Sequence, residues 1–212
     1  MMRGDWRVYV ITDARHPRGR SHREIAEAAI RGGATAVQLR MKEEPARVIL
    51  DVARAIVPLC RAAGVAFIMN DRLDVAMLAG ADGVHVGQDD LPAADARTLL
   101  GPRALIGVSA ATVEEAIAAE RAGANYLGVG AVYGTATKSD AGAPVGLTRL
   151  TEIRRAVRLP LVGIGGITVE NAAAVIRAGA LGVAVITAVT RAEDMAGAVR
   201  RLREAVDGAG AR

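Results

Sequence analysis

The stretch Gly179-Ala180-Leu181-Gly182 follows a helical pattern and precedes a short apolar run, and related stretches occur at three other places in the chain. These are Gly32-Gly33-Ala34, Gly80-Ala81-Asp82-Gly83 and Gly123-Ala124-Asn125. Glycine is favoured just after the end of a helix, because it adopts the left-handed backbone conformation at little cost. Four helix-to-strand junctions therefore share one turn chemistry, which is typical of a chain built from repeated strand–helix units.

Short β-branched runs alternate with amphipathic segments on both sides of these junctions. The expected strands lie near 7–12, 35–40, 65–69, 82–86, 104–108, 125–130, 160–164 and 182–186. The expected helices lie near 21–31, 43–63, 72–79, 93–100, 112–122, 147–157, 168–178 and 192–206. The strands are nearly continuous apolar runs, as in a parallel sheet that is covered on both faces.

Eight strand–helix units in 212 residues favour an α/β fold of the (β/α)8 type, a TIM barrel, with residues 1–212 forming a single domain. A doubly wound open sheet is the competing architecture. The count of eight favours the barrel, and so does the lack of a dinucleotide-binding glycine fingerprint after the first strand.

Composition narrows the class of protein and of ligand. The chain is 51% hydrophobic and only 2% aromatic, so we expect an aliphatic core and no stacking platform for nucleic-acid bases. A net charge of +4 without a basic run fits a small anionic ligand better than a nucleic acid. The single Cys60 excludes a disulfide framework, and we expect it to be buried and inert. With neither a signal-peptide core nor a membrane-length apolar run, we expect a cytoplasmic protein without a membrane partner; a homo-oligomer is left open.

Two rare residue types gather at the ends of expected strands. Of the 27 lysine and arginine residues only Lys42 and Lys138 are lysine, and the only glutamines are Gln38 and Gln88. An ammonium group is a compact, rotatable charge whereas a guanidinium is a rigid fork, so the two are not interchangeable around a phosphate. A composition bias with chance placement is the competing explanation, but the positions favour a ligand site at the carboxyl ends of the strands.

The second expected strand ends in Val37-Gln38-Leu39-Arg40-Met41-Lys42. Strand alternation places Gln38, Arg40 and Lys42 on one side, which predicts a surface for a multiply charged anion. A solvated edge strand is the alternative, and the flanking helical patterns argue against it.

Acidic residues follow the next two expected strands, with Asn70-Asp71 after one and Asp89-Asp90 after the other. Neighbouring strand ends lie side by side, so we expect Asp71 to meet Asp89 or Asp90 over the barrel mouth. Such a pair suits Mg²⁺, which takes one or two carboxylates together with phosphate oxygens and water. Helix N-capping is the competing role for Asp71 and Asp90.

The remaining strand ends carry hydroxyl groups and glycines. Ser109 ends the fifth strand, the long connection 131–146 contains Thr135, Thr137 and Lys138, and the seventh and eighth strands lead into Gly163–Thr168 and Ile186-Thr187. Barrels often bind a phosphate with the loops after the last two strands.

Three further residues have two interpretations each. We expect His85 to be a satisfied core histidine rather than a base, Asp13 to be either a helix N-cap or a site residue, and Trp6 either to plug the barrel bottom or to cover a subunit contact.

Taken in order, these motifs resemble the thiamine-phosphate synthase family over nearly the whole chain. The matching segments are Tyr9–Asp13, Val37–Lys42, Asn70-Asp71, Gly83–Pro92, Gly107–Ser109, Thr135–Asp140, Gly163–Ile167 and Gly182–Thr187. The resemblance implies a (β/α)8 transferase that joins hydroxymethylpyrimidine diphosphate to a thiazole phosphate. Pyrophosphate would leave in a dissociative, carbocation-like displacement.

The resemblance also implies roles for individual residues. Those implied to hold the pyrimidine diphosphate are Gln38, Arg40, Lys42, Asn70, Ser109 and Lys138, of which Arg40, Lys42, Ser109 and Lys138 would be catalytic. Those implied to hold the thiazole phosphate are Thr135, Thr137, Gly166, Ile186 and Thr187. Asp71 and Asp90 would ligate Mg²⁺, with Asp89 only a neighbour.

The chain departs from the family pattern at two places, with Ala111 where histidine is common and Gly134 where proline is common. Two alternatives stay open, a thiazole tautomerase-like enzyme and a non-catalytic phosphate-binding barrel. The Asn70-Asp71 pair and the Thr135–Lys138 run favour the synthase, since the tautomerases usually lack them. We expect Lys138→Arg to reduce turnover far more than its conserved charge suggests.

Overall fold

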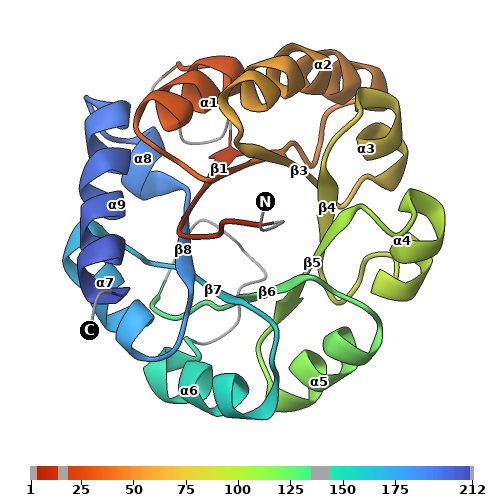
Figure 1. Cartoon of the computed structure of the whole chain (residues 1–212). Helices are drawn as coiled ribbons and strands as arrows, with labels where there is room; N and C mark the ends of the chain where they lie inside the picture. The colour runs from red at the N-terminus through yellow and green to blue at the C-terminus, as the bar shows by residue number, and fades with distance from the viewer. Residues whose placement is uncertain (1–3, 14–18, 135–143, 211–212) are drawn as a thin grey trace.

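Eight parallel strands close into a barrel in sequence order, with helices around the outside (Figure 1). The computed structural model describes residues 4–13, 19–134 and 144–210. The strands are β1 (Val8–Asp13), β2 (Ala36–Arg40), β3 (Ala66–Asn70), β4 (Gly83–Val86), β5 (Leu105–Ala110), β6 (Tyr126–Val129), β7 (Leu161–Ile164) and β8 (Gly182–Val185). The predicted (β/α)8 barrel is confirmed, and the open-sheet alternative is wrong because β1 pairs with β8.

A helix follows each strand, as predicted. The helices are α1 (His22–Arg31), α2 (Ala46–Ala63), α3 (Leu73–Ala79), α4 (Ala93–Leu100), α5 (Val113–Arg121), α6 (Gly146–Ala156), α7 (Val169–Arg177), α8 (Thr187–Thr190) and α9 (Met195–Gly210). Helices α2 and α9 depart most from the expected ranges, and α9 spans Met195–Gly210 rather than about 192–206. Helix α2 begins at Ala46 rather than near residue 43, because Pro45 is its N-cap and disfavours a helical residue before it. The four-residue α8 was not predicted, since it is too short to show a periodic pattern.

The helix-to-strand junctions contain the backbone conformation that their glycines predicted. Gly33, Gly80, Gly123 and Gly179 have positive φ angles of 89°, 69°, 83° and 109°. Other residues adopt this region with strain, so one type of turn returns the chain from the helices to the strands at four places.

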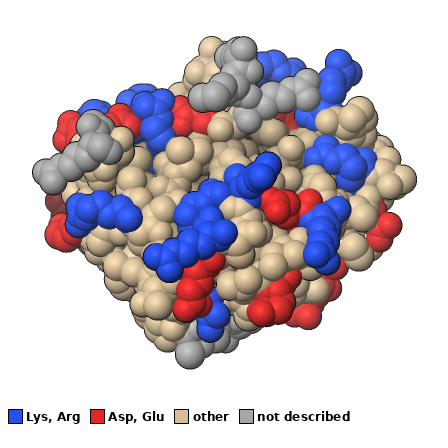
Figure 2. All heavy atoms as spheres, turned by 60° about the horizontal axis from the view of Figure 1, so that its bottom comes forward, with Lys and Arg blue, Asp and Glu red and all other residues tan. Residues whose placement is uncertain are grey.

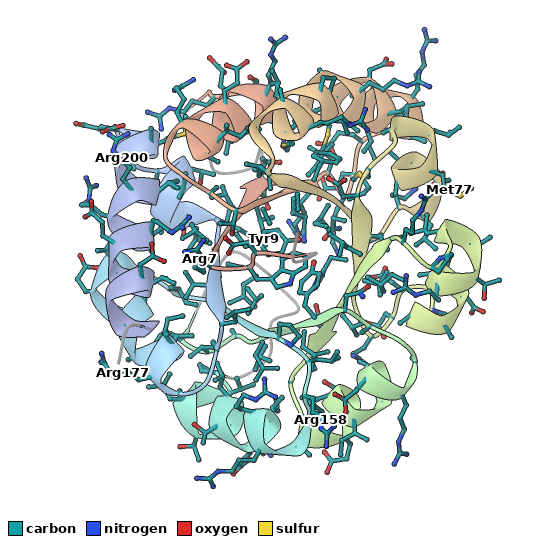
Figure 3. The ribbon with its side chains drawn as sticks, in the orientation of Figure 1. Arg7, Tyr9, Met77, Arg158, Arg177 and Arg200 are labelled. Carbon is teal, nitrogen blue, oxygen red and sulfur yellow. The ribbon has the colours of Figure 1, made fainter. Side chains whose placement is uncertain are left out.

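Side chains alternate between an outer core and the barrel interior. The outer core is mostly aliphatic and lies between strands and helices, with Val37 and Leu39 among its members and Phe67 as an aromatic one. The interior contains a separate cluster that includes Trp6, Tyr9 and Tyr126. Figure 3 shows Tyr9 near the barrel centre, whereas Met77, Arg158, Arg177 and Arg200 lie at the periphery.

The position of Trp6 decides between its two interpretations. Its side chain is 1% exposed, and its ring stacks on Tyr126 with a centroid distance of 3.9 Å. Trp6 therefore closes the barrel interior before β1 begins, and a stacked pair of this kind adds about 0.5–1.5 kcal/mol beyond its buried area.

Two other expectations concern Cys60 and the surface. Cys60 is buried, as predicted, and burial raises the pKa of its thiol to about 12. Basic side chains lie beside acidic ones on the face shown in Figure 2. Within the part of the chain that the structure describes, no helix combines the length and apolar character needed to cross a bilayer.

Candidate active site

The carboxyl end of β2 places two of its predicted site residues inside the barrel mouth. Gln38 and Arg40 are buried and face inward, while Leu39 between them belongs to the outer core. Arg40 Nη1 donates to Asp13 Oδ2 at 2.5 Å, and the two residues are 5% and 1% exposed. The predicted alternation is confirmed for Gln38 and Arg40 and places a fixed guanidinium at the mouth, whereas Lys42 lies beyond the end of β2.

Asp13 is the ion-pair partner of Arg40, which the sequence did not predict. The N-cap interpretation is wrong, because Ser21 caps α1 and forms a capping box with Glu24. Asp13 lies directly opposite Arg40 in the β1–β2 ladder. The pairing follows from this strand register, which cannot be read from the sequence alone.

Two carboxylates meet beyond β3 and β4, as predicted for Asp71 with Asp90. Burial, followed by the hydrogen bond and charge repulsion of Asp90, raises the pKa of the Asp71 carboxyl above its ordinary value. Lys42, whose Nζ is 3.4 Å from Asp71 Oδ2, lowers the pKa of the same carboxyl. Asn70 Nδ2 donates to the same carboxylate oxygen at 2.6 Å. Asp71 has a φ angle of 60°, a strained conformation for a residue other than glycine.

Neither carboxylate is a helix cap, so that alternative is wrong. The N-cap of α3 is Arg72 and that of α4 is Pro92, and no side chain caps either helix. Asp90 Oδ2 instead accepts the Gly87 N–H at 2.7 Å, which holds the loop after β4.

This carboxylate pair fits a hard divalent cation. Two like charges raise each other's proton affinity, and a cation between them would relieve that repulsion. Among the described residues, no group of three or more His, Cys, Asp and Glu side chains is arranged to hold a metal ion. Two carboxylates alone would suit a cation such as Mg²⁺, which takes one or two carboxylates and completes its shell with phosphate oxygens and water.

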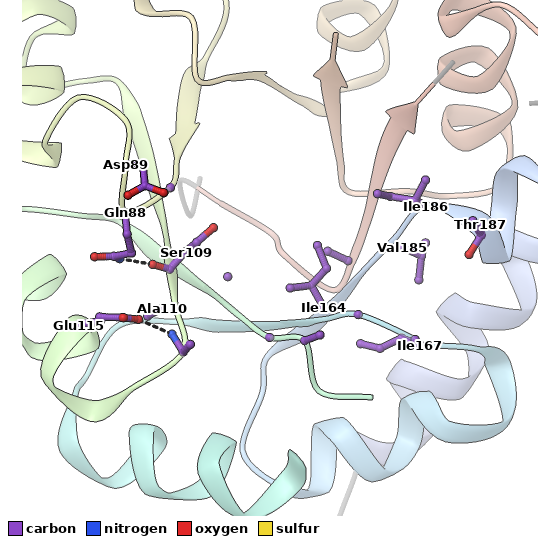
Figure 4. Close-up of a pocket in the computed structure, with 18 residues that line it drawn as sticks. Gln88, Asp89, Ser109, Ala110, Glu115, Ile164, Ile167, Val185, Ile186 and Thr187 are labelled. Atoms are coloured by element: carbon purple, nitrogen blue, oxygen red, sulfur yellow. Dashed lines mark hydrogen bonds between the residues drawn. The ribbon is translucent and has the colours of Figure 1, made fainter. Parts of the chain in front are cut away.

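The other half of the mouth is hollow. A pocket of about 240 Å³ lies at the ends of β4 to β8 (Figure 4). Its lining includes four of the predicted site residues, Ser109, Gly166, Ile186 and Thr187, together with Gln88, Asp89 and Ala111. The predicted residues Gln38, Arg40, Lys42, Asn70, Asp71 and Asp90 do not line it. The cations and the Asp71–Asp90 pair thus occupy one side of the mouth, and an open pocket, with Asp89 and Glu115 as its charged lining residues, occupies the other.

Ser109 is fixed by contacts on two sides. Gln88 Nε2 donates to the Ser109 carbonyl oxygen at 2.5 Å, a contact drawn in Figure 4. The Ser109 hydroxyl lies 3.0 Å from His85 Nε2, and His85 Nδ1 lies 3.1 Å from the Tyr126 hydroxyl. His85 has partners for both ring nitrogens, which confirms the expectation of a satisfied histidine.

A glycine turn after β7 forms the wall opposite Ser109. Gly165 and Gly166 have φ angles of 95° and 66°. A Cβ atom on Gly166 would lie 2.7 Å from both Gly134 O and Tyr133 Cβ. The turn therefore needs glycine both for its conformation and for its close approach to the segment after β6. Backbone groups of such turns are suited to anions.

Three predicted residues, Thr135, Thr137 and Lys138, lie outside the described residues. Their proposed roles rest on the sequence.

Comparison with known proteins adds a family to this geometry. A family model described as "Thiamine monophosphate synthase" matches residues 8–189. A thiamine-phosphate synthase of Roseiflexus castenholzii is 59% identical over 195 residues, covering 92% of this chain and 86% of the relative. One of Moorella thermoacetica is 55% identical over 201 residues, covering 95% and 96%. The solved thiamine phosphate pyrophosphorylase from Pyrococcus furiosus superimposes with a TM-score of 0.89 at 40% identity, covering 97% of each chain.

Proposed function

The chain belongs to the thiamine monophosphate synthase family, and on that basis we propose how its barrel mouth performs the reaction. It is a transferase of thiamine biosynthesis. The proposed substrates are hydroxymethylpyrimidine diphosphate and a thiazole phosphate, and the products are thiamine phosphate and pyrophosphate. One observation carries the assignment: a cluster of cations and paired carboxylates lies beside a separate hollow pocket in one barrel mouth.

The charged half of the mouth is proposed to bind the diphosphate. Arg40 is already oriented by Asp13, so little side-chain entropy would be lost when an anion binds it. Lys42 is more exposed, at 40%, and its ammonium group can rotate toward a phosphate oxygen. Gln38 and Asn70 add amide donors beneath these cations, and Lys138 is assigned here from the sequence.

Asp71 and Asp90 would hold Mg²⁺ in this proposal. Once bound, the ion would neutralise negative charge on the diphosphate and so make it a better leaving group. The raised pKa of the Asp71 carboxyl, caused by burial and by Asp90, supports a pair that is poised for a cation.

The hollow half is proposed to bind the thiazole phosphate. The glycine turn at Gly165-Gly166 brings backbone close to the pocket, and Ile186 and Thr187 line it at the start of α8. A pocket of about 240 Å³ can enclose a small ring and shield it from water. Thr135 and Thr137 are assigned to the same phosphate from the sequence.

The residues suit a displacement that needs no protein nucleophile. The bond between the pyrimidine methylene carbon and the diphosphate oxygen breaks, and its electron pair leaves with pyrophosphate. The thiazole nitrogen supplies the pair for the new C–N bond. The contribution of this chain is to hold both partners in line, to stabilise the departing anion with Arg40 and Lys42, and to exclude water.

Neither alternative from the sequence is favoured by an observation. The relatives at 59% and 55% identity are named synthases, and the paired carboxylates have no evident use in a non-catalytic binder. Location in the cytoplasm and assembly into a homo-oligomer stay predictions.

A coupled assay tests the proposal. The enzyme is supplied with both substrates and Mg²⁺, and the release of pyrophosphate and the formation of thiamine phosphate are measured, with an EDTA-treated sample as control. We expect product only with Mg²⁺. Product formation that survives complete metal removal would contradict the role of Asp71 and Asp90, and no product at all would contradict the reaction.

A further inference from the structure

A continuous chain of hydrogen bonds runs through the barrel interior below the pocket. Gln38 Nε2 donates to the Tyr9 hydroxyl at 2.8 Å, and the Tyr9 and Tyr126 hydroxyls lie 2.9 Å apart. The Tyr126 hydroxyl lies 3.1 Å from His85 Nδ1, and His85 Nε2 lies 3.0 Å from Ser109 Oγ. The five residues come from β2, β1, β6, β4 and β5, and a cavity of about 20 Å³ lies among them. The chain thus links a residue on the charged side of the mouth to one on the hollow side.

The direction of donation along this chain follows from its first member. Gln38 presents an N–H to Tyr9, so the Tyr9 oxygen accepts and its own proton is directed to Tyr126. The Tyr126 oxygen accepts that bond, and its proton then points to His85 Nδ1. A neutral imidazole that accepts at Nδ1 carries its proton on Nε2. In the arrangement that leaves neither tyrosine O–H without an acceptor, His85 therefore donates from Nε2 to the Ser109 oxygen.

The Ser109 O–H then remains available to donate one hydrogen bond. Its hydroxyl oxygen accepts from His85, and among the described residues no acceptor contacts its O–H. Ser109 lines the pocket, so the proton faces the space where a substrate would lie. The two tyrosines remain neutral at ordinary pH, because burial raises the pKa of both phenols. Ionisation of the tyrosines therefore does not reverse the direction of the chain at ordinary pH.

We propose that Tyr126 and His85 are positioning residues, which fix the His85 tautomer and so keep the Ser109 hydroxyl as a hydrogen-bond donor to the bound substrate. The part that concerns Ser109 and substrate rests on the proposed function, whereas the tautomer does not. If the chain served only to fill the barrel, the packing of Tyr126 on Trp6 would account for it, and the order of the protons would have no effect on turnover.

The first test needs no substrate. In ¹⁵N-labelled protein at about pH 8, above the ordinary titration range of imidazole, long-range ¹H–¹⁵N spectra report which ring nitrogen carries the proton. We expect the Nε2–H tautomer for His85, with its signals identified by their loss in His85→Asn. In Tyr126→Phe, which keeps the ring, the fixed tautomer should give way to a mixture. An Nδ1–H tautomer or a mixture in the unmodified protein would overturn the proposal.

The second test asks whether the chain acts through Ser109. Losing one oriented neutral hydrogen bond should reduce kcat/KM of the coupling reaction roughly tenfold in Tyr126→Phe. In a Ser109→Ala background, Tyr126→Phe should reduce kcat/KM by less than about twofold, because the hydroxyl that the chain positions is already absent.

Tyr9→Phe is the matched control, since it deletes the same atom from an equally buried ring one bond farther from His85. Tyr126 keeps His85 as its acceptor in that variant, so we expect a loss below about threefold. Equal losses in the two tyrosine variants would overturn the positioning role, and so would an undiminished loss for Tyr126→Phe in the Ser109→Ala background. If no variant shows activity, including the unmodified enzyme, the proposed reaction fails while the tautomer result still decides the direction of the chain.

Discussion

The two halves of the barrel mouth use opposite means to receive ligands. On the side of β2 to β4, charged groups are packed against one another, with Arg40 bound to Asp13 and Lys42 close to Asp71. On the side of β5 to β8, the lining is mostly backbone, small residues and aliphatic side chains, and it encloses an open pocket. One half is filled with paired charges, and the other is hollow.

The difference shows that burying charged groups and keeping a pocket open place different demands on the folded state. A buried charge without a partner loses much hydration energy, so the buried charges of this half are paired while no ligand is present. Among the described residues, Arg40 Nε still has no hydrogen-bond partner. A hollow lined mainly by uncharged groups needs little more than a rigid wall, which glycine turns and strand ends supply. On the charged side a diphosphate would therefore meet cations that already have carboxylate neighbours, whereas on the hollow side a ligand would enter space that is already formed.

Breaking the buried ion pair should produce the largest effect. We expect Arg40→Met to lower the free energy of unfolding by about 3–5 kcal/mol, because Asp13 would remain buried without its cation. Urea denaturation measures the loss.

The double variant Asp13→Asn, Arg40→Met is the control, since it removes both charges and should recover most of the lost stability. Ser109→Ala, on the hollow side, should lower the free energy of unfolding far less than Arg40→Met does. A loss below about 1 kcal/mol for Arg40→Met would show that the charged half is not held together by this pair.

Removing one of the paired carboxylates should lower turnover and, in the absence of metal, raise stability. We expect Asp71→Asn to lower turnover roughly a hundredfold, the scale seen when one electrostatic stabiliser of a transition state is lost. Without metal, the same variant should be more stable than the unmodified protein at neutral pH, since it removes the repulsion from Asp90.

The sign of the pH dependence follows from the raised pKa of Asp71, which burial and Asp90 cause. A carboxyl whose pKa is higher in the folded state contributes stability below its ordinary pKa, and that contribution is lost as pH rises through the folded value. Thermal unfolding in chelator should therefore show the advantage of Asp71→Asn shrinking as pH falls toward about 4. An advantage that grows toward low pH would contradict the assignment.

Much of the fold, and part of the contrast between the two halves of the mouth, could be predicted from the sequence because both depend on local patterns. The glycine junctions and apolar runs predicted each strand, and strand alternation predicted that Gln38 and Arg40 face inward. The resemblance to a family then gave the meeting of Asp71 with Asp90 a function.

What could not be predicted depends on how strands align with one another. Asp13 meets Arg40 only because of the β1–β2 register, and a parallel register is set by packing across the whole sheet. The interior hydrogen-bond chain joins residues from five strands, so no local pattern contains it. The positive φ of Asp71 had no signal either, since such strained positions usually carry glycine.

The rigid wall of the hollow half can be tested with two glycine substitutions. Gly166→Ala and Gly123→Ala both place alanine at a positive φ, 66° and 83°, so they share the cost of that conformation. A Cβ at Gly166 would also lie 2.7 Å from Gly134 O, whereas a Cβ at Gly123 would meet no atom within 4 Å. We expect Gly166→Ala to be the less stable by about 1 kcal/mol, measured by urea denaturation.

The same pair of variants should differ in substrate binding. Only Gly166→Ala should raise KM for the thiazole phosphate, because only that turn lines the pocket. Equal KM values would show that the wall tolerates displacement and that the hollow half is not rigid.

The smallest effect on stability should come from Lys42. Its side chain is 40% exposed and its ammonium group is 3.4 Å from Asp71, a pair that solvent screens. Lys42→Met should therefore change the free energy of unfolding by about 0.5 kcal/mol or less, although it lies in the charged half. Its turnover should nevertheless fall strongly, and Lys42→Arg should recover only part of it, because a planar fork does not reproduce a rotatable ammonium. If Lys42→Arg retained full turnover, the rarity of lysine in this chain would carry no information about the site. If Lys42→Met lost several kcal/mol, Lys42 would resemble Arg40 in stabilising the fold as well as the ligand, and the contrast between the two cations would be wrong.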